Sequence, residues 1–158
     1  MGFSSSIYYV EKSDKKMTYF DVIDSLYKNE NDNRDITLIN NLNTLSFKGN
    51  VLYRFIDHLN DFVLKRLNNM EERLTKSILN YNQVDEFNLD ILNFNKEINY
   101  LFQFSNIKMI PDDEKNKIKK LINENVSIII DNLMFYAKKD PNNEILIKII
   151  SESLKVGE

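Results

Sequence analysis

The sequence has few of the residues that catalytic and metal sites need. It contains one histidine, no cysteine and no tryptophan in 158 residues. Without cysteine the chain has no disulfide, no thiolate nucleophile and no thiolate metal ligand, and it fits a reducing compartment. The three glycines and two prolines form no glycine-rich phosphate loop and no nucleophile elbow. These absences favour a protein that presents a surface for recognition, so we expect neither an enzyme nor a cofactor.

The charge and the apolar segments exclude two further classes of partner. The net charge is −3, and acidic and basic residues are interspersed without the basic stripe that nucleic-acid binding needs. The most apolar segment, residues 126–136, is too short to span a bilayer and contains Asp131. The N-terminus lacks the apolar core of a secretory signal. We therefore expect a cytoplasmic protein that binds no nucleic acid and has no membrane span.

The first residues match a loose lipidation pattern. Gly2 follows Met1, and Ser6 stands where the N-myristoylation pattern requires Ser or Thr. The bulky Phe3 beside the glycine favours the alternative, an ordinary N-terminus. Gly2 is therefore a candidate lipidation site, and an ordinary, unmodified N-terminus is the alternative.

Apolar residues recur at steps of three and four along most of the chain, which is the pattern of amphipathic helices. We predict one all-α domain over residues 1–158, a bundle of about six helices preceded by an N-terminal arm at residues 1–17. The arm contains a short β-leaning run at residues 6–12. The predicted helices cover residues 19–28, 35–48, 50–81, 85–104, 111–136 and 141–154.

Several helix starts carry a local signal. Thr18 and Asp21 have the spacing of a capping box before the first helix. Asp35 and Asn50 can cap the second and third helices. Pro111 is expected as the first residue of the fifth helix, where its missing N–H costs nothing.

Two of the longer helices have distinctive interiors. Asn68 and Asn69 are weak helix formers and favour a break inside the third helix. Residues 126–136 are apolar nearly all round, so we expect this segment to be the central, buried helix of the bundle.

His58 is the only imidazole, and it lies one helical turn after Arg54. An Arg–His pair on a helix suggests a helical RNase of the HEPN type, which places four to six residues between the two. This chain has three residues between Arg54 and His58, so the motif is not matched. A solvated helix face with weak intrahelical contacts is the interpretation we favour, and we assign no catalytic residue.

Neighbouring acids raise the question of a metal site. A carboxylate metal site in a helical bundle needs inward-facing acids on several helices, often with a Glu-x-x-His motif, and no such motif occurs. The pairs Asp57 with Asp61 and Glu71 with Glu72 are expected to be solvated. The acids at residues 112–114 suit the positive start of a helix. We therefore expect no metal.

The order of segments resembles one protein family. A short aromatic arm, SIYYVEKSDKK, precedes TYFDVIDSLYKN; a helix then opens with GNVLYRFIDHLNDFVLK, and MIPDDEKNKIKK leads into an apolar helix. This order resembles the poxvirus Bcl-2-like proteins, which are intracellular immune-evasion factors. The closest local similarity is the Gly-x-x-x-Tyr start followed by Leu-Asn-Asp-Phe at residues 59–62. The Asn-Trp-Gly-Arg signature of cellular Bcl-2 proteins is missing, and the chain has no Trp at all.

The resemblance implies a non-enzymatic inhibitor of host innate-immune signalling or apoptosis that acts in the host cytoplasm. A BH3-type helix would then lie in an apolar groove. The residues expected to line that groove share one face of the third helix: Tyr53, Phe55, Leu59, Phe62 and Val63. Alternatively the groove is closed, and another face binds a signalling adaptor or forms a homodimer. Two other functions stay open, a phage or bacterial immunity or anti-defence protein and the helical RNase.

Overall fold

Six helices build the described part of the structure, a computed structural model that describes residues 9–11, 16–28, 34–80, 84–140 and 143–154. The helices are α1 (Tyr19–Tyr27), α2 (Ile36–Leu42), α3 (Asn50–Asn80), α4 (Val84–Phe104), α5 (Asp112–Ala137) and α6 (Asn143–Ser153). Two short strands, β1 (Tyr9–Glu11) and β2 (Lys16–Thr18), pair antiparallel before α1. The prediction of an all-α, single-domain bundle of about six helices is confirmed.

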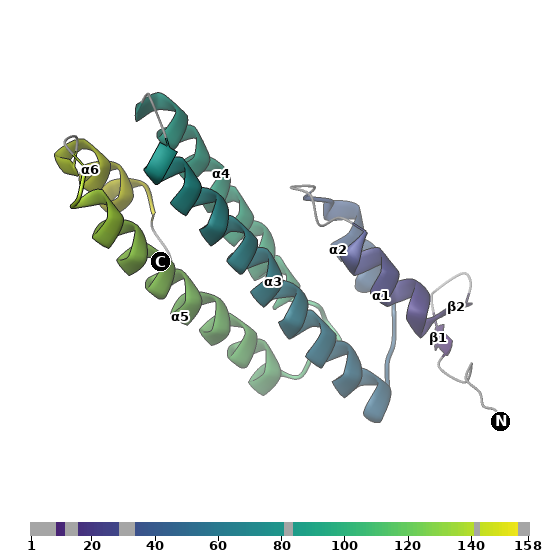
Figure 1. Cartoon of the computed structure of the whole chain (residues 1–158). Helices are drawn as coiled ribbons and strands as arrows, with labels where there is room; N and C mark the ends of the chain where they lie inside the picture. Colours follow the sequence, from purple (N-terminus) through teal and green to yellow (C-terminus); the bar gives the residue numbers. More distant parts are fainter. Residues whose placement is uncertain (1–8, 12–15, 29–33, 81–83, 141–142, 155–158) are drawn as a thin grey trace.

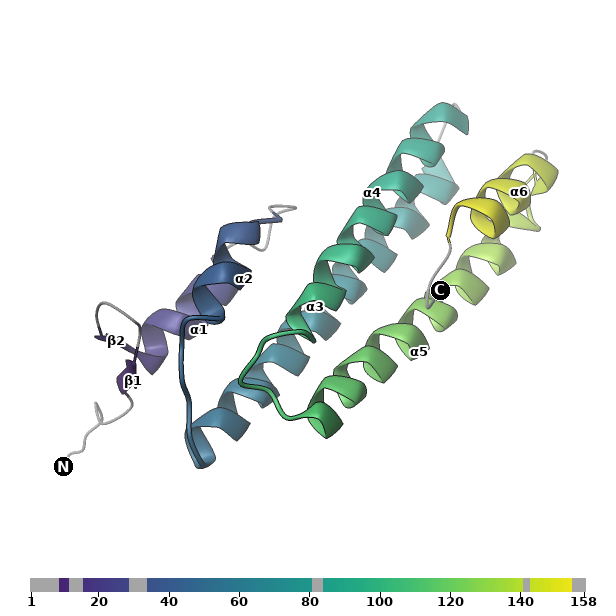
Figure 2. The ribbon, with the colours of Figure 1, turned by 180° about the vertical axis from the view of Figure 1, so that it is seen from behind.

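The helices lie in three layers (Figures 1 and 2). α3 and α4 run side by side in the middle, with α1 and α2 on one side and α5 and α6 on the other. α3 and α5 run in the same direction and are in contact, while α4 runs the opposite way (Figure 1). In the described segments, no helix is both long enough and apolar enough to cross a membrane.

The expected central position of residues 126–136 is wrong. Only one stripe of α5 is fully buried. Ile128 and Phe135, which belong to the same apolar run, are 56% and 57% exposed. The buried stripe consists of Ile118, Ile122, Val126, Ile129, Leu133 and Ala137. The physical reason is that α5 lies in an outer layer, so neighbouring helices cover one side of it and leave the other in solvent.

α3 is unbroken through the two asparagines that favoured a break. Asn68 and Asn69 are exposed, while Leu67 and Met70 on either side of them are buried. The low helix propensity of Asn costs only about 0.5 kcal/mol per residue, and burial of the flanking apolar side chains outweighs it. The helix starts after Gly49, whose φ of +58° is a left-handed conformation that glycine adopts without a steric penalty.

α2 ends earlier than predicted, at Leu42 instead of near residue 48. Asn43 caps its end, and the following turn is tightened where the Thr44 hydroxyl donates to the Asn41 carbonyl at 2.7 Å. The apolar residues that suggested more helix, Leu45 and Phe47, are buried from a non-helical connection instead. The spacing of buried apolar residues therefore extends beyond the last residue of the helix, and this is why the sequence predicted a longer one.

Two predicted helix starts are close to those observed. The Asp35 carboxylate accepts a hydrogen bond from the Thr37 N–H at 2.9 Å and caps α2 as predicted. Pro111 precedes α5 as its cap residue, with an extended ψ of 151°, so it lies one position before the helix that it was expected to open. The acids Asp112, Asp113 and Glu114 occupy the first turn of α5, where they favour the positive end of the helix dipole.

Candidate interaction site between α3 and α5

The residues predicted to line a partner groove are mostly core residues. Tyr53 is 52% exposed, but Phe55, Leu59, Phe62 and Val63 are fully buried. The Phe62 ring packs edge-on against Phe104 of α4, with the centroids 5.2 Å apart. This face of α3 is therefore turned into the bundle, because a stripe at steps of three and four is also what helix–helix packing needs. Gly2, the candidate lipidation site, lies outside the described residues.

Arg54 and His58 lie on the flank of α3 that adjoins α1. Arg54 is exposed and His58 is half-buried. Helical spacing places Lys65 on the same flank, and its ammonium lies 5.5 Å from the ring centroid of Tyr27 in α1. Within the described ranges, no group of three or more His, Asp or Glu side chains could hold a metal ion. The helical RNase stays the disfavoured alternative, and our prediction that neither residue is catalytic stays a prediction.

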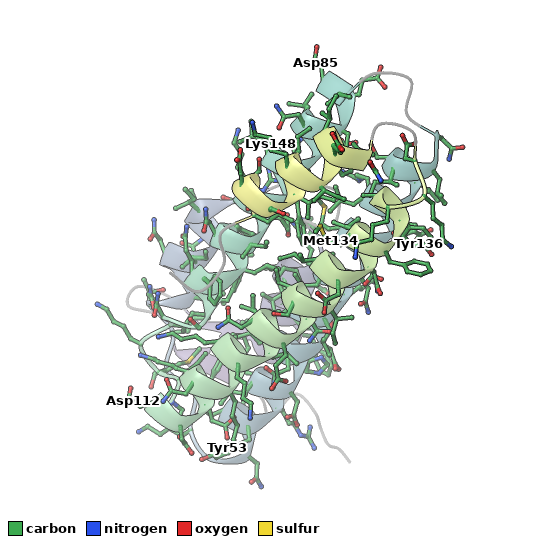
Figure 3. All side chains as sticks on the ribbon, turned by 90° about the vertical axis from the view of Figure 1, so that its left-hand side faces the viewer. Tyr53, Asp85, Asp112, Met134, Tyr136 and Lys148 are labelled. Carbon is green, nitrogen blue, oxygen red and sulfur yellow. The ribbon has the colours of Figure 1, made fainter. Side chains whose placement is uncertain are left out.

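A groove of about 590 Å³ lies between the outer sides of α3 and α5. Side chains of both helices line it: Asn68, Glu71, Glu72, Thr75 and Lys76 from α3, and Asn132 and Tyr136 from α5. Figure 3 shows Tyr136 at the edge of α5, on the far side of that helix from Lys148 of α6. The groove therefore opens beside α3, away from the contact between α5 and α6.

Glu71 is the charged residue of the groove that is partly buried. Its carboxylate accepts a hydrogen bond from the side-chain amide of Asn132 at 3.2 Å, which ties α3 to α5. Its neighbour Glu72 is exposed and forms an ion pair with Lys76 at 3.2 Å. The structure thus pairs Glu72 with a cation and Glu71 with an amide. The Glu71 carboxylate keeps capacity to accept further hydrogen bonds.

Two large apolar side chains flank the groove on α5. Ile128 and Phe135 are more than half exposed, and the spacing Ile128–Asn132–Phe135 places them on the same flank as the groove amide. The Phe135 and Tyr136 rings meet edge-on with centroids 5.7 Å apart. The Lys139 ammonium lies 4.1 Å from the Phe135 ring centroid. We call these residues together the α3–α5 surface: Glu71, Asn132, Tyr136, Ile128 and Phe135. This surface combines aromatic, aliphatic and acidic groups.

The interior holds a charged cluster that the sequence analysis did not identify. Arg66 of α3 donates two hydrogen bonds to Glu97 of α4, at 2.5 and 2.8 Å. Arg34, before α2, lies 3.5 Å from the same carboxylate and donates to the Asn93 carbonyl at 2.7 Å. The cluster therefore fastens the start of α2 to the middle layer. The available signal was a charged residue inside each apolar stripe.

Tyr100 completes this cluster. Its ring centroid lies 5.7 Å from the Arg66 guanidinium, and its hydroxyl lies 3.4 Å from the Asp35 carbonyl oxygen. Burial raises the pKa of the Tyr100 hydroxyl above its ordinary value, and the acids Glu97 and Asp35 raise it further. The Arg66 guanidinium and the backbone hydrogen bond act in the opposite direction. Tyr100 therefore stays protonated where an exposed tyrosine begins to ionise.

No protein-family model, curated protein or solved structure matches the chain. The resemblance to the poxvirus Bcl-2-like proteins stays a prediction. The α3–α5 surface is a candidate interaction site that the sequence analysis did not identify. Its two apolar members, Ile128 and Phe135, were visible in the sequence, but they were assigned to a buried helix.

Proposed function

We propose that the protein is a non-enzymatic interaction factor that binds a partner protein through the α3–α5 surface. The observation that carries this proposal is the exposure of Ile128 and Phe135 beside a groove with polar side chains. Aromatic side chains at the centre of protein interfaces supply much of the binding energy, and surrounding polar groups supply direction. Tyr136 and Asn132 stand next to the apolar pair and offer such groups.

The resemblance to viral Bcl-2-like proteins supports a partner in host innate-immune signalling or apoptosis. In that role the protein would bind a signalling protein and block its contacts with other partners. A phage or bacterial anti-defence factor would use the same surface on a different target. Both roles need a partner that contacts α5 from outside the bundle.

Paired substitutions test the surface. The double variant Ile128→Gln with Phe135→Gln removes both apolar groups, and glutamine keeps good helix propensity. The matched control is Leu89→Gln with Leu92→Gln, which changes two exposed leucines of α4. A photo-crosslinking amino acid at Asn68, which is exposed on α3 and lines the groove, would report partner capture in cells expressing each variant.

We expect the α5 double variant to lose the crosslinked partner band and the α4 double variant to keep it. Both variants should unfold close to the wild-type temperature, because exposed substitutions change stability by only about 0.5 kcal/mol. Equal crosslinking by both variants would overturn the proposal, and so would loss of the band in the α4 variant alone.

A further inference from the structure

We propose that α1, α2 and the connection after α2 form a detachable layer, which leaves the bundle as one unit while α3, α4, α5 and α6 stay folded. We call residues 19–27 and 34–47 together the N-terminal layer. A buried joint at Arg34 holds this layer closed, and its opening uncovers an apolar face of α3. The N-terminal layer lies on the opposite side of α3 and α4 from α5 (Figures 1 and 2), so the inference goes beyond the proposed function.

The other four helices form a unit without the N-terminal layer. α3 contacts α4 and α5, α4 also contacts α5 and α6, and α5 contacts α6. Each of the four therefore has at least two neighbours within the set, which is the arrangement of a four-helix bundle around its own core. A set of mutually packed helices can stay folded while a peripheral segment opens.

The N-terminal layer is attached to one side of this unit. α1 contacts α3, and α2 contacts α1 more than it contacts either middle helix. At the end of α2, the Lys108 N–H donates to the Asn43 side chain at 3.0 Å. The two helices have nine and seven residues, and isolated helices of fewer than about 12 residues are marginal in water. Once they leave the middle layer they lose the burial that keeps them helical, so detachment and local unfolding are one event.

The joint lies where the chain enters α2. Arg34 donates to the backbone carbonyl of Asn93 at 2.7 Å, and its Nε lies 3.5 Å from the Glu97 carboxylate. The next residue, Asp35, accepts at its carbonyl oxygen from the Tyr100 hydroxyl at 3.4 Å. Two consecutive residues of the N-terminal layer thus make three polar contacts with α4, and all three are broken when the layer opens.

Opening the joint leaves the rest of the buried charge cluster intact. Glu97 keeps its two hydrogen bonds from Arg66, because both residues belong to the four-helix unit. Arg34 gains water: within the described residues its buried Nε–H donates to no acceptor, and a buried, unpaired donor is costly. Hydration of Arg34 therefore offsets part of the contact energy that is lost on opening. The joint stabilises the closed layer by less than a fully paired arginine would.

The face of α3 beneath the N-terminal layer is aromatic. The Phe62 ring packs edge-on against Tyr27 of α1, with the centroids 6.2 Å apart, and the Phe55 ring packs against Phe47 at 4.8 Å. Both α3 rings are fully buried in the closed structure. Opening therefore exposes an apolar face that the closed protein hides, and access to that face depends on the N-terminal layer.

Single introduced thiols test the inference, because the chain contains no cysteine of its own. Val22→Cys places a thiol in α1 and Val126→Cys places one in α5, and both valines are buried. A thiol reagent labels each cysteine only when its segment opens. We expect faster labelling of the Val22→Cys protein, since detachment of the layer exposes α1 whereas exposure of α5 needs global unfolding. Equal or slower labelling of the Val22→Cys protein would overturn the inference.

A substitution in the four-helix unit separates the two kinds of opening. Ile150→Val reduces a fully buried side chain of α6 and should speed the labelling of Val126→Cys about two- to tenfold. Labelling of Val22→Cys should not change, because the contacts of Ile150 persist when the N-terminal layer opens. An equal increase at both positions would mean that the chain opens only by global unfolding, and the detachable layer would be wrong.

The joint is tested by Arg34→Gln, with Lys148→Gln as the control that removes an exposed cation from α6 (Figure 3). Arg34→Gln should speed the labelling of Val22→Cys about tenfold, the effect of losing one charge-assisted hydrogen bond, and Lys148→Gln should not. Native-state hydrogen exchange of the wild-type chain should give the amides of α1 and α2 one common opening free energy, lower than that of α5. Unchanged labelling with Arg34→Gln, or separate opening free energies for α1 and α2, would overturn the inference.

Discussion

The guanidinium of Arg66 and the carboxylate of Glu97 form a two-bond ion pair inside the bundle, with donor–acceptor distances of 2.5 and 2.8 Å. The side chains are 4% and 1% exposed. The pair joins α3 to α4, the two helices of the middle layer. Removing two charges from water is costly, and only good geometry with further hydrogen bonds offsets that cost. Arg34 adds a second positive charge, with its Nε 3.5 Å from the same carboxylate.

Breaking the Arg66–Glu97 pair should be far more harmful than replacing it. Glu97→Ala leaves the Arg66 guanidinium buried without its partner, and we expect the free energy of unfolding to fall by about 3–5 kcal/mol. The double variant Arg66→Met with Glu97→Leu removes both charges and keeps the volume, so it should lie within about 1 kcal/mol of the wild type or above it. Urea denaturation measures both values. A double variant as unstable as Glu97→Ala would contradict this account.

The sequence predicted the position of most helices because they carry strong local signals. The periodic apolar residues located α3 and α4 to within one residue at either end, and the Asp35 cap located the start of α2. The position of α5 could not be predicted in this way. In the run at residues 126–136, Ser127 and Asp131 mark only a narrow exposed strip, and the apolar residues on either side of it can be buried or exposed. The packing of α3, α4 and α6 against α5 decides which of them are buried.

The candidate site depends on contacts between distant parts of the chain. Glu71 and Asn132 are separated by 61 positions in sequence, and nothing local to either residue predicts that they meet. The sequence-based groove failed for a related reason. The stripe of Phe55, Leu59 and Phe62 has the same spacing whether it faces a partner or the core, and it faces the core.

Tyr100 should make the protein sensitive to alkaline pH. Burial raises the pKa of its hydroxyl in the folded state, so this contribution to stability is complete below about pH 10, the ordinary tyrosine value. It is lost as the pH rises from there through the folded pKa, because the unfolded chain releases the proton first. Tyr100→Phe should therefore show a shallower loss of unfolding free energy above pH 10 than the wild type. Urea denaturation from pH 8 to pH 11 checks this, with Tyr53→Phe, which removes an exposed hydroxyl, as the control.

A side chain at position 49 should lower stability through backbone strain, without a steric clash. Its φ is +58°, and a Cβ built there meets no atom within 4 Å. Gly49→Ala should therefore lower the free energy of unfolding by about 1 kcal/mol through left-handed strain. Gly49→Asn should cost less, because asparagine tolerates this conformation better than alanine does. Thermal unfolding of the two variants tests the order, and an Ala variant as stable as the wild type would show that the turn adopts another conformation.

Two alanine substitutions in α5 test which side of this helix is buried. Leu133 is fully buried and Ile128 is 56% exposed, although both lie in the same apolar run. Leu133→Ala leaves a cavity, and we expect it to lower the free energy of unfolding by about 2–5 kcal/mol. Ile128→Ala should change it by less than about 0.5 kcal/mol, because the side chain loses little burial and alanine has the better helix propensity. A helix wrapped on all sides would lose several kcal/mol with either substitution. Urea denaturation of the two variants therefore distinguishes an outer α5, which presents Ile128 and Phe135 to a partner, from a central one.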